Sequence, residues 1–584
     1  MKHMTSRFAK AIVLGLVCAM GVPVGAKSNQ ALGEDTQNDT IKINQLGYLP
    51  NAAKQAVVGL GDETFKVVDS SQRIVFSGRS FVVRSCPYSG ESVRIADFTP
   101  ASKPGRYYLV TARGKSYPFT ISDTLLKSLS YASLRAFYYN RASIAIDAEH
   151  GGRWSRPMGH PDTSVIVHQS AASKERPAGF RFSSPKGWYD AGDYNKYIVN
   201  SGISCYTMLL AYHQNAAYYQ KQTLNIPESN NSLPDILDEL LWNLRWMLTM
   251  QDPNDGGVYH KLTNKSFDGF VMPDKATEAR YVVSKSTAAT LDFAATMAYS
   301  YRVFSAHRKQ LPGFADSCLA ASKKAMQWAE QNPNLLYDQP SDVFTGKYDD
   351  TNLSDEWFWA KVELALATKE KSYLKGVSIA DVKSATPTWN SVGMLGVYSL
   401  ALSSKGEVDK LFQQQAARKL VAFADSLCKV QQLSAYNISL TSFDWGSNSD
   451  VANQGIVKML ANKLNPNKKY VAGAYGELSY LLGCNPLGIS YITGVGSKSP
   501  MNIHHRPSGA DGIEEPVPGF LAGGPNLVVP TDCGPSPKRD VIHPAKSYED
   551  SLCSYSTNEV AINWNAPLAC LVGLIDAYYQ STNK

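Results

Sequence analysis

Two aspartates three positions apart form the first candidate site for acid–base chemistry. They lie in the segment Gly187-Trp-Tyr-Asp190-Ala-Gly-Asp193-Tyr-Asn195, and an amphipathic stretch follows from Asn195. We interpret the segment as a tight loop that leads into a helix N-terminus, where backbone N–H groups and the helix dipole favour ionised carboxylates. Two carboxylates held this close could together hold and deprotonate a water molecule. The alternative is a helix N-cap next to an unrelated loop aspartate.

A glutamate far downstream could supply a proton to the same reaction. Glu559 opens an otherwise apolar run, VAINWNAPLACLVGLI, at residues 560–575. A carboxyl group beside apolar surface has a raised pKa, because desolvation disfavours its charged form. One ionised aspartate pair plus one protonatable glutamate is what acid-catalysed glycosidic cleavage needs. The alternative is that Glu559 only caps the final helix.

A third segment, Ser490–Arg506, combines His504, His505 and Arg506 in a loop rich in Gly, Ser and Asn. A lone histidine is usually structural, whereas two histidines with an arginine in a polar loop suit recognition of a polar ligand. Together, in order and spacing, the three segments resemble the active-site motifs of glycoside hydrolase family 9, the cellulase family. The resemblance covers roughly residues 125–580.

The resemblance implies a role for each carboxyl group. In the family, the second aspartate of the DAGD motif is the general base, which here is Asp193, and the first, Asp190, helps to hold the same water. Glu559 matches the general acid, and Asp550 matches an aspartate that supports the acid region. The family inverts the anomeric centre, which requires a water between base and sugar. The carboxyl groups of base and acid should therefore lie roughly 6.5–9.5 Å apart.

Three further residues are expected to contact the substrate. His504 and Arg506 match the family's His and Arg that grip the sugar beside the scissile bond. Arginine offers a fork of donors and histidine a single directed donor, and both suit sugar hydroxyls. Trp445, in the segment Phe443–Asn448, is a candidate stacking platform for a glucose ring, because glycine and polar residues surround it. The alternative for Trp445 is a buried core position.

The implied activity is inverting endo-hydrolysis of β-1,4-glucosidic bonds in cellulose-like β-glucans, and the expected partner is a β-glucan polysaccharide or a cello-oligosaccharide. Two alternatives stay open. One is an exo-acting cellodextrinase or glucosidase on the same scaffold. The other is a non-catalytic glucan-binding protein, against which the intact Asp190, Asp193 and Glu559 argue.

The resemblance also gives two expectations about metals, although the chemistry itself requires no cofactor. Many relatives have a zinc site of Cys and His ahead of the DAGD motif. Here the cysteines are absent from the corresponding region and only His160 matches, so we do not expect zinc. The segment Thr351–Glu356 resembles a family calcium segment, so Asp355 and Glu356 could bind a structural calcium through oxygen ligands. The alternative is that both cap the following helix.

Composition and the N-terminus set the remaining bounds. Of the 584 residues, 44% are hydrophobic and 19% charged, an ordinary globular balance with room for more than one domain. Residues 1–26 have the pattern of a cleavable secretory signal, in which three basic residues precede the apolar stretch Ala11–Val24. That stretch is too short to span a membrane, so we expect a secreted or periplasmic protein without a membrane span.

The net charge gives no indication of a nucleic-acid partner. It is +7, and +4 once Lys2, Arg7 and Lys10 are removed with the signal. We expect a monomer. Nine cysteines are present, and none form the paired CxxC spacing of zinc sites. Cys533 and Cys553 flank an active-site loop and could pair, a question that the sequence leaves open.

Two different periodicities divide the rest of the chain. Residues 27–40 are polar and predict a flexible lead-in. Residues 41–122 contain about seven short alternating runs, which predict an antiparallel β-sandwich. The region resembles the immunoglobulin-like module that precedes many family 9 catalytic domains, with Asn44–Tyr48 matching its opening. Exposed aromatics should be few in it, so we expect a supporting role and not sugar binding.

Residues 123–584 show a helical period. In Leu233–Gln251, for example, Ile236, Leu240, Leu244 and Met247 share one face. About eleven such stretches occur, with no convincing strands between them. This pattern predicts a large all-α domain, and the resemblance implies an (α/α)6 barrel whose cleft is built from the loops at one end.

Overall fold

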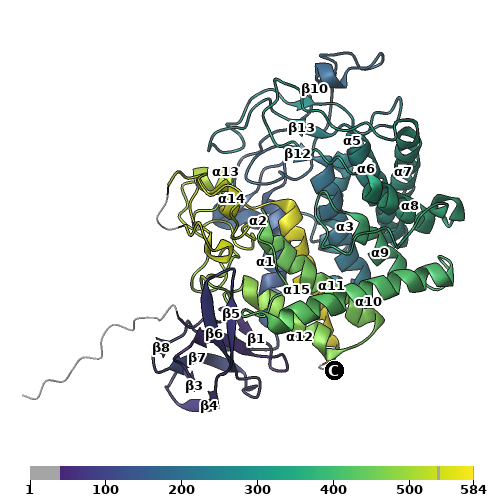
Figure 1. Ribbon diagram of the computed structural model, residues 1–584. Coiled ribbons are helices and arrows are strands. Elements are labelled where there is room, and N and C mark those ends of the chain that lie inside the picture. Colours follow the sequence, from purple (N-terminus) through teal and green to yellow (C-terminus); the bar gives the residue numbers. More distant parts are fainter. Residues whose placement is uncertain (1–39, 536–538, 583–584) are drawn as a thin grey trace, which may run out of the picture. The chain divides into compact units, whose positions relative to one another are not determined.

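The computed structural model describes residues 40–535 and 539–582, all within one compact unit of the chain (Figure 1). The signal predicted at residues 1–26 and nearly all of the lead-in at 27–40 lie outside the described residues. Within the described part, every helix is too short or too polar to cross a lipid bilayer.

The N-terminal part of the described chain is a β-sandwich, as predicted. Its strands are β1 (Gly47–Tyr48), β2 (Gln55–Gly59), β3 (Thr64–Asp69), β4 (Ile74–Arg79), β5 (Phe81–Cys86), β6 (Glu91–Asp97), β7 (Gly105–Thr111), β8 (Gly114–Lys115) and β9 (Phe119–Ile121). One sheet has the order β1-β9-β7-β3-β4, with β8 paired to β7, and the other has the order β2-β6-β5. Alternate residues such as Val67 and Leu109 are fully buried, because successive side chains of a strand point to opposite faces.

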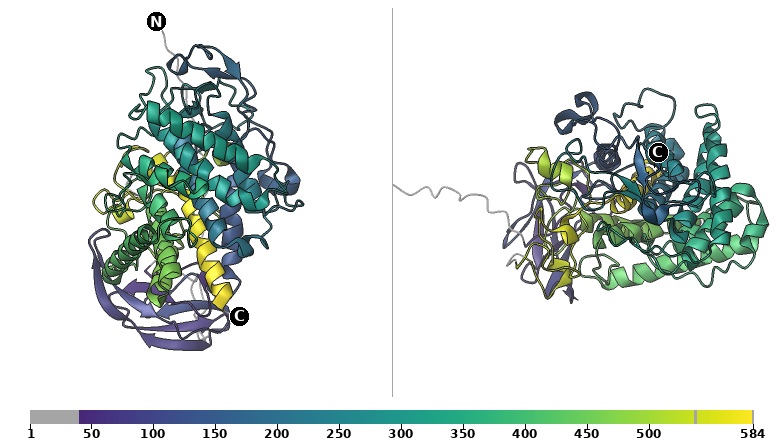
Figure 2. Two further views of the ribbon diagram at one scale, coloured as in Figure 1. Left: turned by 90° about the vertical axis from the view of Figure 1, so that its right-hand side faces the viewer. Right: turned by 90° about the horizontal axis from the view of Figure 1, so that it is seen from above.

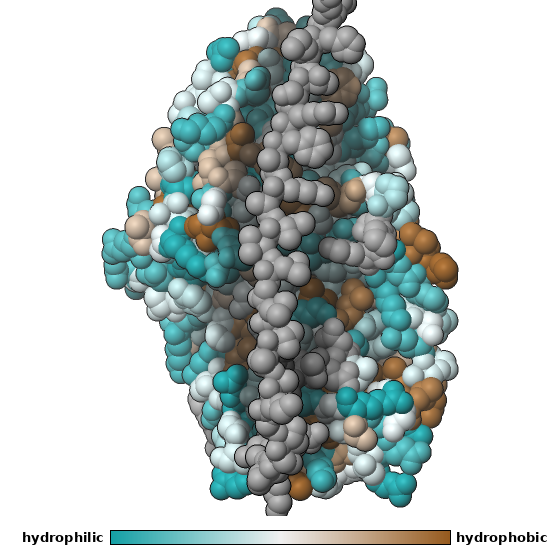
Figure 3. Space-filling model, turned by 90° about the vertical axis from the view of Figure 1, so that its left-hand side faces the viewer, coloured by the Kyte–Doolittle hydropathy of each residue, from teal (hydrophilic) through white to brown (hydrophobic). Residues whose placement is uncertain are grey.

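The surface of the sandwich carries few aromatic side chains. Phe81, on the edge strand β5, is the most exposed aromatic of its described residues, at 44%. On the face drawn in Figure 3, outside the grey atoms, hydrophobic side chains occur in small separate groups among polar ones. Small scattered groups of this kind are ordinary on soluble proteins.

The opening segment of the sandwich holds it against the helical part of the chain. The side-chain amide of Gln45 donates to the Gly488 carbonyl at 2.8 Å. Its oxygen accepts from the backbone N–H groups of Ser497 and Lys498, each at 2.8 Å. Gln45 is 5% exposed, so all three bonds form away from solvent. One side chain therefore supports the loop that leads towards His504.

The rest of the chain is mainly helical, as predicted. The longer helices are α1 (Leu125–Tyr139), α3 (Ile198–Gln214), α5 (Asp235–Thr249), α6 (Thr287–Phe304), α7 (Phe314–Gln331), α8 (Ser354–Thr368), α9 (Gly393–Ala401), α10 (Lys410–Leu433), α11 (Ser447–Leu464), α12 (Lys468–Leu481) and α15 (Ile562–Thr582). Short turns form α2 (Ala148–Gly151), α4 (Ala216–Tyr219), α13 (Arg506–Ala510), α14 (Tyr555–Asn558) and the 3-10 helices η1 (Gly152–Trp154), η2 (Gln169–Ala171), η3 (Ser305–His307), η4 (Lys371–Leu374) and η5 (Pro544–Lys546). Helix α5 lies within the predicted stretch Leu233–Gln251, and eleven longer helices occur among the described residues, against about eleven predicted.

The longer helices pack in a closed series. Helices α3, α6, α8, α9, α10, α11 and α15 contact one another in that order, and α15 returns to contact α3 (Figures 1 and 2). Helices α3, α6, α11 and α15 are buried on nearly all sides, whereas α7 and α10 bury one face only. A helix buried all round lies inside a protein and an amphipathic one lies outside. The helices thus occupy inner and outer positions.

A small sheet lies among the helices, and the prediction of no strands there is wrong. Its strands are β10 (Val165–Val167), β11 (Arg181–Phe182), β12 (Lys196–Tyr197), β13 (Lys261–Thr263) and β14 (Tyr281–Val282), in the order β11-β10-β14-β13-β12. Runs of two or three residues are too short for an alternating pattern to be recognised. The sheet matters for the site, because β12 directly follows the Asp190–Asn195 loop and separates it from α3.

Candidate active site

Three carboxyl groups, two from one loop and one from far downstream, line a cleft of about 1150 Å³. They are Asp190, Asp193 and Glu559. Aromatic side chains line much of the remaining wall, namely Tyr197, Phe267, Tyr348, Trp357, Phe358, Trp389, Trp445 and Trp564. A cleft that combines a few polar groups with flat apolar surfaces suits a ligand that has hydroxyl groups and apolar ring faces.

Asp190 is held by side chains and is 1% exposed. Its two oxygens accept from Nδ2 of Asn200 at 2.9 and 3.1 Å, and Oδ2 also accepts from the Tyr348 hydroxyl at 2.8 Å. Burial raises the pKa of Asp190 to about 8, and the neighbouring Asp193 carboxylate acts in the same direction. Asp190 is therefore largely protonated near neutral pH.

Asp193 accepts two hydrogen bonds, both at Oδ2. Nδ2 of Asn195 donates at 2.6 Å and the Tyr197 hydroxyl at 3.2 Å. Neither aspartate side chain accepts from a backbone N–H of α3, which begins only at Ile198. The predicted support from a helix N-terminus is wrong, and so is the alternative of an N-cap. The donors are side chains because β12 lies between the loop and the helix. Both bonds at Oδ2 leave Oδ1 for a water molecule.

Glu559 lies in an extended position between α14 and α15, and its Oε1 accepts from the backbone N–H of Gly192 at 3.2 Å. The alternative that Glu559 caps the final helix is wrong, because α15 begins at Ile562 and the Ile562 N–H bonds to the Asp190 carbonyl at 2.8 Å. Burial raises the pKa of Glu559 well above its usual range, and the Asp193 charge adds to this, while the Gly192 N–H opposes it. Glu559 is therefore a carboxylic acid near neutral pH, able to give a proton.

His504 is paired with Glu559 in a short parallel bridge. Its Nδ1 lies 2.7 Å from the Leu552 carbonyl oxygen, which can only accept, so Nδ1 carries the hydrogen. Burial lowers the pKa of His504, so the ring is neutral and Nε2 is an acceptor. The sequence predicts a donor at this position, but the nitrogen that remains, Nε2, is an acceptor. His504 is not among the residues that line the cleft, so its contact with the sugar stays a prediction.

Arg506 contacts the catalytic loop from behind and does not line the cleft. Its backbone N–H and Nη1 donate to the Gly192 carbonyl at 3.0 and 2.8 Å, and Nε donates to the Asp268 carbonyl at 2.7 Å. The side chain is 7% exposed. Arg506 thus orders the aspartate loop, and contact with the sugar stays a prediction.

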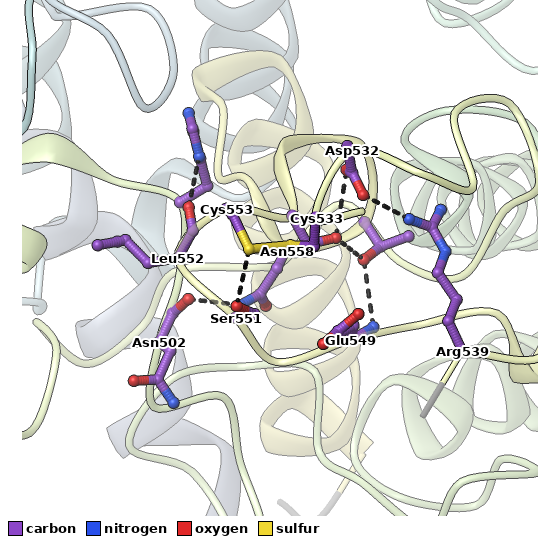
Figure 4. The surroundings of a disulfide bond; sticks show 12 residues. Asn502, Asp532, Cys533, Arg539, Glu549, Ser551, Leu552, Cys553 and Asn558 are labelled. Atoms are coloured by element: carbon purple, nitrogen blue, oxygen red, sulfur yellow. Dashed lines mark hydrogen bonds and ion pairs between the residues drawn. A yellow bond between two sulfur atoms is a disulfide. The ribbon is translucent and has the colours of Figure 1, made fainter. Parts of the chain in front are cut away.

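Asp550 connects the segment before His504 to the residue before Glu559. It accepts from the backbone N–H groups of Met501 and Asn502, each at 2.8 Å, and from Nδ2 of Asn558 at 3.0 Å. Asn558 also donates to the Asn502 carbonyl at 2.7 Å (Figure 4). Asp550 therefore positions both segments without touching the cleft.

A disulfide between Cys533 and Cys553 closes the loop behind these residues (Figure 4). Next to it, Asp532 accepts from Arg539 Nη1 at 2.6 Å and from the Ser556 N–H at 2.8 Å. The pairing that the sequence leaves open is thus present. The other described cysteines are free and buried, namely Cys86, Cys205, Cys318, Cys428, Cys484 and Cys570.

Trp445 lies on the cleft wall, is 41% exposed, and its ring centroid is 5.6 Å from that of Tyr555. The alternative of a buried core position is therefore wrong. Sequence reasoning missed a second aromatic pair, Phe267 and Phe270, which are 48% and 38% exposed. The Arg506 guanidinium lies 5.4 and 5.6 Å from the centroids of these two rings. The sequence does contain a sign of this pair: two phenylalanines flank Asp268-Gly269 in an otherwise polar stretch, which is typical of aromatic side chains exposed on a loop.

Comparison with known proteins agrees with this geometry. The model of glycosyl hydrolase family 9 matches residues 127–572, and that of the cellulase N-terminal Ig-like domain matches residues 36–116. The chain belongs to glycoside hydrolase family 9. Its immunoglobulin-like module and helical catalytic domain are thereby identified, and the resemblance seen in the sequence is confirmed.

Individual family 9 relatives match along nearly the whole chain. The xyloglucan-specific endo-beta-1,4-glucanase BoGH9A of Bacteroides ovatus is 42% identical over 562 residues, which are 92% of this chain and 94% of the relative. Endoglucanase D of Acetivibrio thermocellus is 34% identical over 94% of this chain and 82% of its own. The solved structure "Bacteroides ovatus GH9" superposes with a TM-score of 0.86 at 41% identity and covers 93% of this chain and 99% of its own.

The zinc region of other family 9 proteins has a different environment here. His160, the matching residue, has its Nδ1 2.8 Å from the Tyr189 hydroxyl. Burial lowers its pKa to about 2, and the nearby Arg280 acts in the same direction. The absence of zinc stays a prediction.

Some of the side chains at the candidate calcium segment could be ligands of a hard cation. Glu356 and Asp292 are fully buried, and none of their four carboxyl oxygens has a hydrogen-bond partner. Unpaired buried carboxyl oxygens are the donors that calcium prefers. Asp355, however, accepts from the Val392 N–H at 2.7 Å. Moreover, no three His, Cys, Asp or Glu side chains in the described ranges converge as metal ligands. Calcium binding therefore stays a prediction.

Proposed function

We propose that this family 9 protein is an inverting endo-β-1,4-glucanase in which Asp193 is the general base and Glu559 the general acid. The observation that carries the proposal is that both groups line one cleft and that Gly192, the neighbour of Asp193, donates its backbone N–H to Glu559. The two aspartates thus lie beside a glutamic acid that keeps its proton. Glycosidic hydrolysis with inversion needs one carboxylate that takes a proton from water and one carboxylic acid that gives a proton to the leaving group.

In the proposed reaction, Asp193 takes a proton from a water molecule that Asp190 helps to hold. The water attacks the anomeric carbon from the face opposite the leaving group. Glu559 donates its proton to the glycosidic oxygen as the bond breaks, which releases a neutral sugar hydroxyl. The neutral ring of His504 accepts a hydrogen from a sugar hydroxyl and orients the ring next to the scissile bond.

We propose internal attack on a soluble β-1,4-glucan backbone, because eight aromatic side chains line the cleft of about 1150 Å³ and offer stacking surfaces for several sugar rings. Xyloglucan is a second candidate substrate, favoured by the 42% identity to the xyloglucan-specific relative. We also infer that the closed series of helices is an (α/α)6 barrel and that the chain is an exported monomer.

The test is hydrolysis by the full chain and by Asp193→Ala on carboxymethyl cellulose, mixed-linkage β-glucan and xyloglucan, with thermal unfolding as the check on fold. Asp193→Ala should lose at least about 10²-fold in kcat while still binding oligosaccharide. The exposed Asp316→Asn is the matched control and should keep full activity. Early products from cellohexaose should span several lengths. Cellobiose or glucose as the sole early product would indicate exo action. Near-normal turnover in Asp193→Ala would show that Asp193 is not the general base.

A further inference from the structure

A buried lysine that the proposed reaction does not use lies behind the general base. Lys261, in β13, pairs with Tyr197 of β12 in the small sheet. Lys261 is 0% exposed. Its ammonium group donates to Thr345 Oγ1 at 2.9 Å, Gln339 Oε1 at 2.9 Å and the Gly346 carbonyl at 2.6 Å. All three acceptors are uncharged. A buried ammonium without a bonded carboxylate is costly, and the negative charges that act on this one are those of Asp193 and Asp349.

A chain of hydrogen bonds leads from this ammonium to Asp193. Thr345 Oγ1 lies 2.7 Å from Thr263 Oγ1, and Thr263 Oγ1 lies 3.1 Å from Asn195 Oδ1. The Asn264 N–H also donates to Asn195 Oδ1, at 2.9 Å. With its oxygen held, the Asn195 amide must present its nitrogen to Asp193 Oδ2, at 2.6 Å.

The Lys261 ammonium determines which group donates in the next hydrogen bond of this series. An ammonium can only donate, so Thr345 accepts from Lys261 and its own hydrogen is available to Thr263. The Thr263 hydrogen then has two acceptors, the Asn264 carbonyl at 2.7 Å and Asn195 Oδ1 at 3.1 Å. When it is given to Asn195 Oδ1, every hydrogen points from the lysine towards the carboxylate. Hydrogen bonds aligned in one direction polarise and strengthen one another. The chain therefore favours the ionised form of Asp193 over the protonated form.

The charges around Asp193 explain why such support is needed. The titratable groups that face it are Asp190, Glu559, Asp268, Tyr197, His504 and Lys261. Three of the six are carboxyl groups, His504 is neutral, and Tyr197 keeps its proton because burial raises its pKa. Lys261 is the one cation among these six groups, and the Arg506 guanidinium, which donates to the Gly192 carbonyl, is a second cation close to the same loop. Burial lowers the pKa of Lys261 to about 7, so the lysine is charged at acidic pH.

We propose that Lys261 is a positioning residue that keeps the base Asp193 ionised and oriented, acting through Thr345, Thr263 and Asn195. It touches neither water nor sugar in the reaction. The inference rests on the proposed role of Asp193. Its signature is a shift of the pH dependence, which a purely structural lysine would not produce.

The experiment is the pH profile of kcat/KM on a soluble β-glucan for Lys261→Met. Without the cation, the acid limb should move to higher pH by roughly 0.5 unit or more, because loss of a nearby positive charge raises a carboxyl pKa. Lys261→Arg keeps the charge and should restore the limb towards that of the wild type. Lys54→Met is the matched control, because Lys54 is equally buried and donates to three carbonyl groups in the sandwich. Its limb should not move.

Each outcome bears on a different claim. A folded Lys261→Met with reduced activity and an unmoved acid limb overturns the inference. If this variant does not fold, Thr345→Val interrupts the chain while retaining the lysine and should shift the limb in the same direction by a smaller amount. An unmoved limb there is equally decisive. Retained hydrolysis by Asp193→Ala would instead remove the proposed base, which separates failure of the function from failure of this inference.

Discussion

The backbone N–H of Gly192 donates to Oε1 of Glu559 at 3.2 Å, so the acid is held by the residue next to the base. The carbonyl of the same residue accepts from Arg506. A Cβ at Gly192 would lie 2.2 Å from the His504 carbonyl oxygen, so only glycine fits between the two aspartates. This close approach joins three segments of the site, and it explains the glycine of the Asp190–Asp193 motif.

Glu559→Gln should separate the acid from the rest of the site. Glutamine keeps the shape but has no proton to give, so hydrolysis of cello-oligosaccharides with poor leaving groups should fall by about 10²-fold or more. An aryl glucoside whose leaving group needs little protonation should lose far less. Steady-state kinetics on both substrate types measures the difference. Equal loss on both would mean that Glu559 acts by binding.

The pH dependence of kcat/KM is a second test of Glu559 as the general acid. Burial and the Asp193 charge raise its pKa, so the active protonated form persists above the range of an ordinary glutamate and is lost as the pH rises through the raised value. The wild-type alkaline limb should report this loss, and it should flatten in Glu559→Gln on the activated aryl substrate. A persisting limb there would assign it to another group.

The stereochemistry of the product tests the water-mediated route. One displacement by a water held at Asp193 should release the α-anomer first from a β-linked substrate. Proton NMR of the earliest product, before mutarotation, distinguishes the anomers. A first-formed β-anomer would indicate a covalent intermediate and would contradict inversion.

The sequence predicts those features that repeat along the chain. Helical periodicity of the apolar residues locates the longer helices, and alternation locates the sandwich. Motif order and spacing are enough to assign Asp190, Asp193 and Glu559 to one site. These features depend on local patterns or on known motifs, so they can be predicted from one amino-acid sequence.

Long-range contacts account for what the sequence does not reveal. Strands β12 and β13 have two and three residues and are defined by pairing with each other. The link from Lys261 through Thr345 to Asn195 joins segments separated by up to 150 positions, and no local pattern indicates it. Nε2 of His504 is an acceptor because Nδ1 donates its hydrogen to the Leu552 carbonyl. That carbonyl is brought to His504 only by the folding of its loop.

The N-terminal module should act as a support through Gln45. Gln45→Ala leaves one carbonyl and two N–H groups without their buried partner, which should cost on the order of 2–3 kcal/mol. Thermal unfolding should show a lowered midpoint, and deletion of residues 27–122 should lower it further. The exposed helix position Gln327→Ala is the control. The isolated module should run unretarded in β-glucan affinity gels, and clear retardation would make it a binding domain.

The Phe267 side chain should contribute to substrate binding. It is 48% exposed on the cleft wall, where a sugar ring could stack on it. Phe267→Ala should raise KM for long oligosaccharides roughly 3- to 10-fold, on the order of 1 kcal/mol, with little change in kcat. Phe81→Ala, at a similarly exposed phenylalanine of the sandwich, is the control. A fall in kcat with unchanged KM would indicate that the loop acts on the chemistry instead.

Calcium should decide the protonation of the acidic cluster around Glu356. Burial raises the pKa of Glu356 far above its usual range, and Asp292, Asp355 and Asp350 act in the same direction. Without a cation, the folded protein must hold a proton there that the unfolded chain releases above about pH 4.3. The free energy of unfolding of the metal-free protein should then fall as the pH rises from about 5 to about 8, because the folded state binds more protons.

A bound calcium ion would replace that proton and remove the pH dependence. Denaturant unfolding in EDTA and in excess calcium, at several pH values, measures both effects. Calcium should raise stability most near pH 8, where the uncompensated proton uptake is most costly. Glu356→Gln needs no proton at this position, so its stability in EDTA should depend less on pH and should respond less to calcium. Identical unfolding curves with and without calcium at every pH would show that Asp355 and Glu356 bind no metal and that the cluster is held by protons alone.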